Sequence, residues 1–416
     1  MVSTDASSRL CMGRRDNNMT CGLAEEVTGP IQGSLEMLMR KRQRSVERSG
    51  VPTGRRGEDL NRGLLPEEDA RYMLRGPFRY EWWYFHAVFE NGYSTVGTIL
   101  PLNLNHWRPW RRECAVLFAI YGPGGESRNH FIFPPRHLYR ASYTHCDVLS
   151  GDNYVRGVHP HYEVHFEEGE DVAHLFFEAL TPGWRPGTGI NYFPFPRYRS
   201  FGWLVPVPRA RVRGTLRVGV REMEVEGHGY HDHNWGEVPF ARFIDNWHWG
   251  HVDCGEVGII WSDITLCRSL GHDRIFMFLL SKGDRLILES PEISVTYGEW
   301  REDPENLHPF PGRISVSFGT PGDDARGEFT MRVGSVVETQ DLLEKPPEVP
   351  GRDVPPAVKR FIHGKVAKPC YFRWRSMVDG SVEIEGNDFT LEGETIHEQM
   401  ILHGRFLERQ RGGAGD

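Results

Sequence analysis

The amino-acid sequence predicts an all-β protein with two consecutive sets of antiparallel strands behind a polar N-terminal segment. From Tyr80 onward, short runs alternate between apolar and polar residues, and Gly, Pro, Asp and Asn separate these runs. One helix, near Pro356–His363, is predicted in the second half of the chain. Many short strands with turn residues between them are typical of barrels and sandwiches.

Residues 1–75 are polar and rich in Arg, Gly, Ser and Asn, which predicts a partly disordered leader. A helix is predicted at Leu35–Val46, where a few apolar residues precede a basic end. Its narrow apolar face favours a solvated helix over one that binds a membrane surface or a partner. We expect residues 1–75 to contribute little to the catalytic core.

The first set of strands belongs to a predicted domain at residues 76–240. In His161–Phe166 the residues Tyr162, Val164 and Phe166 share one face of the strand, which is the period-two pattern of a half-buried strand. The predicted strands are Tyr80–Phe89, Thr95–Leu104, Cys114–Tyr121, His161–Phe166, Val172–Leu180 and Arg211–Val220.

The second set belongs to a predicted domain at residues 241–408, and we place the boundary near Val238–Asp245. Hairpin turns are predicted at Lys282-Gly283-Asp284 and at Asp379-Gly380. The predicted strands are Asn246–Asp253, Val257–Thr265, Arg274–Ser281, Arg285–Leu288, Ile293–Tyr297, Ile314–Phe318, Gly327–Val336, Tyr371–Val378, Val382–Glu385 and Glu394–Gly404.

Composition restricts the possible partners and the compartment. The net charge of −8 argues against a nucleic-acid partner. Seven scattered cysteines without metal-type spacing argue against a disulfide framework or a zinc site and fit a reducing compartment. The N-terminus lacks the apolar run of a secretory signal, so we predict a cytoplasmic protein with at most peripheral membrane contact. The oligomeric state stays open.

Aromatic residues are abundant, with 12 Trp, 14 Tyr and 23 Phe. Large rigid rings suit a pocket for an apolar small molecule, although a well-filled β core would use them equally well. The sequence therefore makes an apolar small-molecule ligand the expected partner without proving it.

The densest polar cluster is Gly227–Gly236, in which His231, His233 and Trp235 share one strand face and Asp232 and Asn234 share the other. Three interpretations of the histidines compete. They could bind a metal, they could satisfy one another's hydrogen bonds in the interior, or they could position a catalytic water. The pattern favours the structural interpretation for any single histidine and does not separate it from the catalytic one.

Asp263 lies on a strand face that it shares with Val257, Ile259 and Trp261. Burial among apolar residues would raise the pKa of this carboxyl group, and a carboxyl kept protonated can act as a general acid. Alternatively, Asp263 lies at the mouth of the strand, solvated and ionised.

Three motifs resemble the carotenoid 1,2-hydratase (hydroxyneurosporene synthase) and AttH-like superfamily: Tyr80–Phe85, Tyr230–Gly236 and Trp247–Gly250. The resemblance covers residues 77–405 and keeps the order of the motifs. It implies two tandem lipocalin-like antiparallel β-barrels and no metal cofactor. It also implies an enzyme, because the superfamily includes hydratases, cyclases and Diels–Alderases.

In the hydratases, an aspartate on a strand after the histidine motif is the proposed proton donor. By this resemblance Asp263 takes that role, and His233, Trp235 and Trp261 match its neighbours. In a hydratase, His231 or His233 would hold the water that is added. Trp261 is a departure, because the hydratases carry a Tyr-like hydroxyl there, and His86 stands where relatives often have an acid. Both departures weaken the case for a carotenoid substrate.

We therefore expect acid-catalysed hydration or cyclisation of a C=C bond in an apolar, isoprenoid-like substrate, without a cofactor. The alternatives are a lipocalin-type pericyclase and a non-catalytic carrier of apolar ligands. An aspartate placed beside Trp and His favours an enzyme over a carrier. The expected substrate-binding residues are Trp82, Trp83, Tyr84, Trp247, His248 and Trp249.

Overall fold

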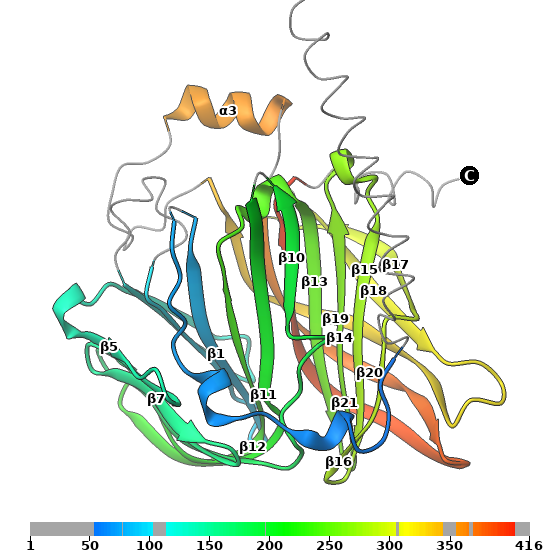
Figure 1. Ribbon diagram of the computed structural model, residues 1–416. Coiled ribbons are helices and arrows are strands. Elements are labelled where there is room, and N and C mark those ends of the chain that lie inside the picture. The colour runs from blue at the N-terminus through cyan, green and yellow to red at the C-terminus, as the bar shows by residue number, and fades with distance from the viewer. Residues whose placement is uncertain are drawn as a thin grey trace, which may run out of the picture. The chain divides into compact units, whose positions relative to one another are not determined.

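The computed structural model describes residues 54–76, 78–102, 114–195, 197–304, 308–343, 355–365 and 369–403, without the side chains of 191–199 and 363–365. The described residues from Gly54 onward form one compact unit. They build two antiparallel sheets, one after the other along the chain (Figure 1). The all-β prediction is confirmed, whereas the helix predicted at Leu35–Val46 lies outside the described residues.

The first sheet has twelve strands within the described residues, in the spatial order β4-β3-β2-β1-β12-β11-β9-β8-β7-β6-β5, and β10 pairs with β11. The period-two pattern of β8 is confirmed, since Tyr162, Val164 and Phe166 are all buried. The strand bounds are β1 Tyr80–Phe89, β2 Ser94–Leu100, β3 Ala115–Tyr121, β4 Ser127–Ile132, β5 Tyr139–Ala141, β6 Cys146–Ser150, β7 Asn153–Val158, β8 His161–Glu168, β9 Asp171–Ala179, β10 Ile190–Phe195, β11 Arg197–Val218 and β12 Arg221–Gly236.

The second sheet has nine strands within the described residues, in the order β16-β15-β14-β13-β21-β20-β19-β18-β17. The chain passes from the first sheet to the second through residues 237–243, and a division into separate domains there stays a prediction. The strand bounds are β13 Ile244–Cys254, β14 Val257–Leu266, β15 Arg274–Lys282, β16 Arg285–Ser290, β17 Ile293–Glu302, β18 Pro309–Phe318, β19 Ala325–Asp341, β20 Cys370–Ile384 and β21 Asn387–Ile401.

Of the two predicted hairpin turns, one is confirmed and the other is wrong. Lys282 pairs with Arg285, so Gly283 and Asp284 form the turn between β15 and β16. Asp379 and Gly380 instead lie inside the long strand β20, where Gly380 pairs with Phe329 of β19. The β20–β21 turn is formed by residues 385–386, both with positive φ, where the chain reverses between Ile384 and Asn387.

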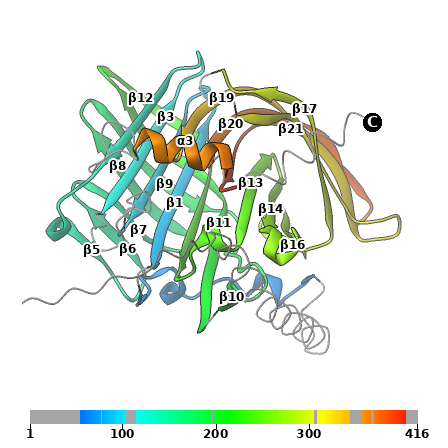
Figure 2. The ribbon, with the colours of Figure 1, turned by 90° about the horizontal axis from the view of Figure 1, so that it is seen from above.

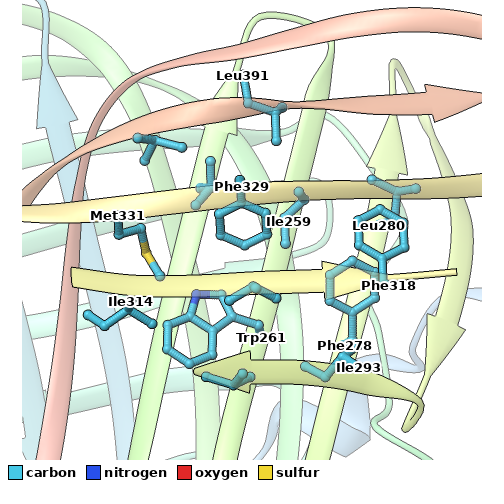
Figure 3. Close-up of a cluster of buried hydrophobic side chains, with 14 of the residues drawn as sticks. Ile259, Trp261, Phe278, Leu280, Ile293, Ile314, Phe318, Phe329, Met331 and Leu391 are labelled. Carbon is cyan, nitrogen blue, oxygen red and sulfur yellow. The ribbon is translucent and has the colours of Figure 1, made fainter. Parts of the chain in front are cut away.

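Each sheet is curled, as the view from above shows (Figure 2), and the side chains inside each curl form an apolar core. Figure 3 shows the core of the second sheet, where Trp261 of β14 and Phe278 of β15 lie near Phe318 and Phe329 from the opposite side of the curl. A third apolar cluster combines residues of both sheets, including Tyr84 of β1 and Trp249 of β13. The structure thus has the tandem half-barrel architecture that the resemblance implies.

The helices of the described residues are short. The predicted helix is confirmed as α3, Pro356–Lys365, which lies across the upper end of the sheets (Figures 1 and 2). The 3₁₀ helices are η1 Leu60–Arg62, η2 Pro66–Asp69, η4 Arg136–Leu138, η5 Phe240–Arg242 and η6 Arg268–Leu270. Within the part of the chain that the structure describes, no helix combines the length and the apolar character needed to cross a membrane.

The expectation that residues 1–75 contribute little is wrong for 54–75. Leu60 is buried, and the Asn61 side chain hydrogen-bonds both the N–H and the carbonyl of Leu286 in β16. Glu68 forms an ion pair with Arg185, and Asp69 enters the core of the first sheet. Polar composition misled the prediction because these polar groups have specific partners.

The buried side chain of Arg209 joins the two sheets. Arg209 belongs to β11, and its guanidinium binds both carboxylate oxygens of Asp253 in β13, at 2.9 and 3.1 Å. It also donates to the carbonyls of Gly255, Glu256 and Gly283 in two hairpin turns of the second sheet. A guanidinium that binds a carboxylate with two hydrogen bonds and donates its other hydrogens to carbonyls fixes both the distance and the relative orientation of the two sheets.

Replacing Arg209 should therefore loosen the contact between the sheets. We expect Arg209→Met to lower the free energy of unfolding by about 3–5 kcal/mol, because it removes the bidentate partner of the buried Asp253 carboxylate and leaves only the exposed His228 ring, 3.7 Å away. The matched control is Arg217→Met, also on β11, whose hydrogen bond to the Glu170 carbonyl is solvent-exposed. Urea unfolding should place the control within about 0.5 kcal/mol of the wild type. Equal stability of the two variants would contradict the clamp.

Candidate functional site

A cavity of about 710 Å³ lies between the two sheets. It is lined by the outward faces of both, and Ile362 of α3 contributes to its wall. The aromatic side chains that line it are Phe78, Tyr80, Trp82, Tyr84, Phe118, Phe131, Phe201, Trp203, Phe240, Trp247, Trp249 and Tyr371.

On the first sheet, β1 and β12 present a hydroxyl and a carboxyl group side by side. Tyr84 pairs with Asp232 in the β1–β12 register, and both line the cavity. Because side chains alternate along a strand, Asp232 and Asn234 face the cavity while His231 and His233 face the barrel core. The predicted division of these residues between two faces is confirmed, and the acid on the cavity face is Asp232.

The Asp232 side chain is buried, and its carboxyl group accepts hydrogen bonds from three neighbouring side chains. Tyr230 Oη and Trp203 Nε1 donate to its Oδ2 at 2.8 and 3.2 Å, and Asn234 Nδ2 donates to its Oδ1 at 2.8 Å. Desolvation, together with the negative charge of Glu398, raises the pKa of Asp232 to about 8, although the hydrogen bonds from Tyr230 and Trp203 act to lower it. Asp232 is therefore a carboxylic acid at neutral pH, inside a cavity of mostly apolar walls.

On the second sheet, four side chains form a row across neighbouring strands. Trp249 of β13 pairs with Ser262 of β14 on one side and with Glu398 of β21 on the other, and Glu398 pairs with Arg373 of β20. All four residues line the cavity. The Tyr84 ring packs edge-on against Trp249, with centroids 5.8 Å apart, so the row faces Tyr84 across the cavity.

Arg373 is the positive charge of this row and is held by two carboxylates. Its Nη1 donates to Glu338 and its Nη2 to Glu398 at 3.3 Å. Nη1 also donates to the hydroxyl of Tyr121, on β3 of the first sheet, at 2.6 Å. This contact places a second polar connection between the sheets, at the side of the cavity.

The predicted histidines belong to a buried network in the first barrel. Asp69 bridges His231 and His233, with nitrogen–oxygen distances of 3.1 and 3.3 Å, and His233 also contacts Glu81. Burial alone would raise the pKa of Asp69, but the two histidines outweigh it and lower that pKa to about 2. Burial likewise opposes protonation of His233, yet Asp69 and Glu81 raise the pKa of His233. The histidines thus have hydrogen-bond partners in the interior, which fits the structural interpretation, and Asp69 fastens the segment 54–76 to the barrel.

Asp69, Cys146 and His231 present ligand atoms within 4.8 Å of one another, which is the spacing of a possible metal site. The same atoms are used in hydrogen bonds, since His231 Nε2 and Tyr162 Oη both contact Asp69 Oδ2 at 3.1 Å. Burial raises the pKa of the Cys146 thiol well above its usual range, and metals bind the thiolate. The group is better explained as part of the hydrogen-bonded core.

Two other predicted residues, Trp235 and Trp83, also belong to the first barrel. Trp235 stacks on Tyr72 with ring centroids 3.8 Å apart. Trp83 stacks on His233 and donates from its Nε1 to the Asp69 carbonyl at 3.1 Å. Both rings pack the network of Asp69 and the histidines, so neither borders the cavity.

Asp263 lies in the core of the second barrel, and the apolar surroundings expected for it are wrong. Arg274 on the neighbouring strand binds both of its carboxylate oxygens, and Tyr297 Oη donates to Oδ2 at 2.6 Å. Both carboxylate oxygens of Asp263 are therefore already engaged by hydrogen-bond donors of the second barrel. The alternative of a solvated carboxylate is also wrong, because the Asp263 side chain is 1% exposed.

Trp261 and His248 share the interior of the second barrel with Asp263. Trp261 belongs to its apolar core, and the His248 ring packs on Trp261. His248 Nε2 contacts His397 Nδ1 at 2.9 Å, and His397 Nε2 contacts Ser376 Oγ at 2.7 Å. Of the expected substrate-binding residues, the cavity therefore gathers Trp82, Tyr84, Trp247 and Trp249, and the barrel cores take Trp83 and His248.

His86 lies between the sheets, opposite His251 of β13, with 3.3 Å between His86 Nε2 and His251 Nδ1. Burial lowers the pKa of His86 well below its usual range, and the charge of His251 lowers it further. Burial lowers the pKa of His251 to about 4, against the opposing effect of Asp253. The pair is therefore neutral near pH 7 and forms part of the contact between the sheets.

Several solved structures share this fold. A protein from Nitrosomonas europaea that is described as an AttH superposes with a TM-score of 0.56 at 14% identity, covering 82% of this chain and 98% of that chain. This is the AttH-like tandem lipocalin fold. The AttH-like fold also appears in CghA (TM-score 0.56, 12% identity, 84% and 98% covered) and in kievitone hydratase from Nectria haematococca (TM-score 0.52, 13% identity, 84% and 96% covered).

Sequence comparison also finds relatives of this chain, and one of them fits the resemblance that the motifs indicate. A hydroxyneurosporene dehydrogenase of Chlorobaculum tepidum is 27% identical over 51% of this chain and 64% of its own length. The quinolone epoxide rearrangement protein asqO of Emericella nidulans is 32% identical over 27% of this chain and 31% of its own length. The chain thus spans less than two thirds of the curated relatives it matches. No family model matches it.

The neutral histidine pair makes stability depend on pH. The unfolded chain binds a proton at His251 below its ordinary pKa of 6.5, whereas the folded chain does so below about 4. This contribution is therefore complete above about pH 6.5 and is lost as the pH falls toward 4, by up to about 1.4 kcal/mol per pH unit. We expect His251→Asn, which keeps a group at the Nδ1 position, to flatten the decline in melting temperature between neutral pH and pH 4. The exposed His161→Asn should leave the decline as in the wild type.

Proposed function

We propose that the protein catalyses acid-dependent hydration or cyclisation of a C=C bond in an apolar substrate bound between the sheets, with Asp232 as the proton donor. The observation that carries this proposal is the pKa of Asp232, raised to about 8 in a cavity with largely aromatic walls. A general acid works best when its pKa lies near the working pH. The fold and the names of the relatives support natural-product chemistry of this kind in general terms.

In the proposed reaction, the proton of Asp232 passes to one alkene carbon, and a carbocation forms at the other. Trp82, Tyr84 and Trp249 present aromatic rings to the cavity, and such rings stabilise a desolvated cation by about 2 kcal/mol each. In a hydratase, water adds to the cation and returns one proton to the Asp232 carboxylate. In a cyclase, an internal alkene captures the cation and a neighbouring C–H bond returns the proton.

Asp263 stays the alternative proton donor that the resemblance implies. Its ion pair with Arg274 and its place in the second barrel core favour Asp232 for this role. The names of the relatives fit the same acid chemistry, because an epoxide rearrangement and a hydration can both begin with a proton transfer to the substrate. The cytoplasmic location and the independence of cofactors remain predictions.

The two acids can be compared by isosteric substitution. We expect Asp232→Asn to lower turnover by roughly 10²–10⁴-fold with little change in ligand affinity, because only the proton is removed. Asp263→Asn is the matched control, and we expect it to retain turnover per folded molecule even if its stability falls. Farnesol, farnesylacetone and neurosporene serve as first substrates, with water addition or cyclisation followed by mass spectrometry. The reverse order of the two variants would return the role to Asp263.

The protonation state of Asp232 also predicts a pH profile. Turnover should be level below about pH 8 and should decline about tenfold per pH unit above it, as the carboxyl group ionises. In deuterated water, the product should carry solvent-derived deuterium on carbon. A product without deuterium would indicate a pericyclic reaction, and binding without any product would indicate a carrier.

A further inference from the structure

We propose that the substrate carries a neutral carbonyl oxygen, which binds in the cavity between Tyr84, Trp249 and Arg373. The inference deepens the proposed function, and it rests on that function for the position of the reacting double bond beside Asp232. It divides the cavity into a polar subsite and an apolar remainder. A pure hydrocarbon would fill the remainder and leave the subsite unused.

The subsite is defined by buried donors that have no partner among the described residues. The four that form the subsite are the hydroxyl of Tyr84, Nε1 of Trp249, the hydroxyl of Ser262 and Nε of Arg373. The hydroxyl of Tyr80 also has no such partner, but it lies at the Gly236 end of the cavity, outside the subsite. Each residue is more than nine-tenths buried, and each lines the cavity. A buried polar group without a hydrogen bond is costly, so several of them around one cavity point to a ligand that supplies the missing partner.

The chemistry of these groups selects an acceptor. An indole N–H and a guanidinium N–H can donate but cannot accept, while the two hydroxyls can do either. A carbonyl oxygen accepts two hydrogen bonds and has no proton of its own to satisfy. A carbonyl oxygen can therefore accept one hydrogen bond from Trp249 and a second one from either Arg373 or Tyr84.

The charges around the subsite exclude an anion as the preferred ligand. Arg373 supplies one positive charge, and the carboxylates of Glu338 and Glu398 both bind it. The cluster thus carries excess negative charge before any ligand enters. A buried carboxylate or phosphate would be repelled, whereas a neutral carbonyl avoids that repulsion.

The subsite also adjoins the proposed acid. Tyr84 pairs with Asp232 on the first sheet, and its ring contacts Trp249 on the second. An oxygen held by Tyr84 would orient the attached carbon chain past Asp232. Tyr84, which would bind the carbonyl, and Asp232, which would deliver the proton, therefore occupy paired positions on the neighbouring strands β1 and β12.

A set of ligands with the same isoprenoid tail tests the proposal by binding alone. Farnesene, farnesylacetone and farnesoic acid provide a hydrocarbon, a ketone and a carboxylate, and quenching of cavity tryptophan fluorescence reports their affinities. We expect the wild type to bind farnesylacetone roughly tenfold more tightly than farnesene, and more tightly than ionised farnesoic acid. Equal affinity for ketone and hydrocarbon, or tightest binding of the acid, would overturn the proposal.

Single variants then locate the subsite. Tyr84→Phe should remove most of the ratio of ketone to hydrocarbon affinity while farnesene binds as before. Tyr80→Phe is the matched control, because it removes the same hydroxyl from the same strand at the Gly236 end of the cavity, and its ratio should stay that of the wild type. If Tyr84→Phe does not fold, Trp249→Phe should lower the same ratio. A ratio that is unchanged in both Tyr84→Phe and Trp249→Phe, or lost in Tyr80→Phe alone, would contradict the assignment.

Asp232→Asn separates this proposal from the proposed function. The variant should keep the ketone preference, because the subsite lies on its neighbours. A ketone preference that depends on Tyr84 in a protein without Asp232-dependent turnover would leave the subsite standing and refute the acid catalysis. Turnover that depends on Asp232 without any ketone preference would do the reverse.

Discussion

The cavity depends on the buried guanidinium of Arg209, because this group holds two independently curled sheets face to face. Its partners are the Asp253 carboxylate and three turn carbonyls, all from the second sheet. A small displacement of one sheet would leave a buried cation and a buried anion without their partners before water could reach them, so the contact fixes the position of one sheet on the other. Gly258 permits this approach, since a Cβ atom there would lie 2.2 Å from Cδ of Arg209. The aromatic side chains of the two sheets can therefore line a cavity between them while Arg209 keeps the sheets in a fixed relative position.

Much of the fold could be predicted from the sequence because the determining signals are local. Alternation of apolar residues located most of the strands, and Gly283 marked a real turn. The error at Asp379-Gly380 has a physical reason: a turn dipeptide is also tolerated inside a strand where a neighbouring backbone comes close, and an added Cβ at Gly380 would lie 2.4 Å from the Glu328 carbonyl oxygen. Pairing across the sheet decided between these outcomes, and pairing is not a local property.

The candidate site was predicted in part. The sequence correctly divided His231 and His233 from Asp232 and Asn234, but it could not show which face would border the ligand. In a single barrel the cavity would lie inside, on the histidine face, whereas here the cavity lies between the two sheets, on the opposite face. Arg274 and Tyr297 bind the carboxyl group of Asp263 and argue against its expected role as the acid. Both come from other strands, so the sequence around Asp263 does not reveal them. Asp69 was missed because its surroundings in the sequence are polar.

Strand β1 builds two structures at once. Glu81, Trp83 and Phe85 belong to the interior of the first barrel, while Tyr80, Trp82 and Tyr84 border the cavity. Substitutions at the second set can reshape the ligand space without disturbing the barrel, since the two sets never share a face. Insertion or deletion of one residue would exchange the sets and destroy both. Natural variants of this architecture should thus diversify in ligand choice by point substitution along β1 while its length is conserved, which gives the scaffold room to evolve new specificities on an unchanged frame.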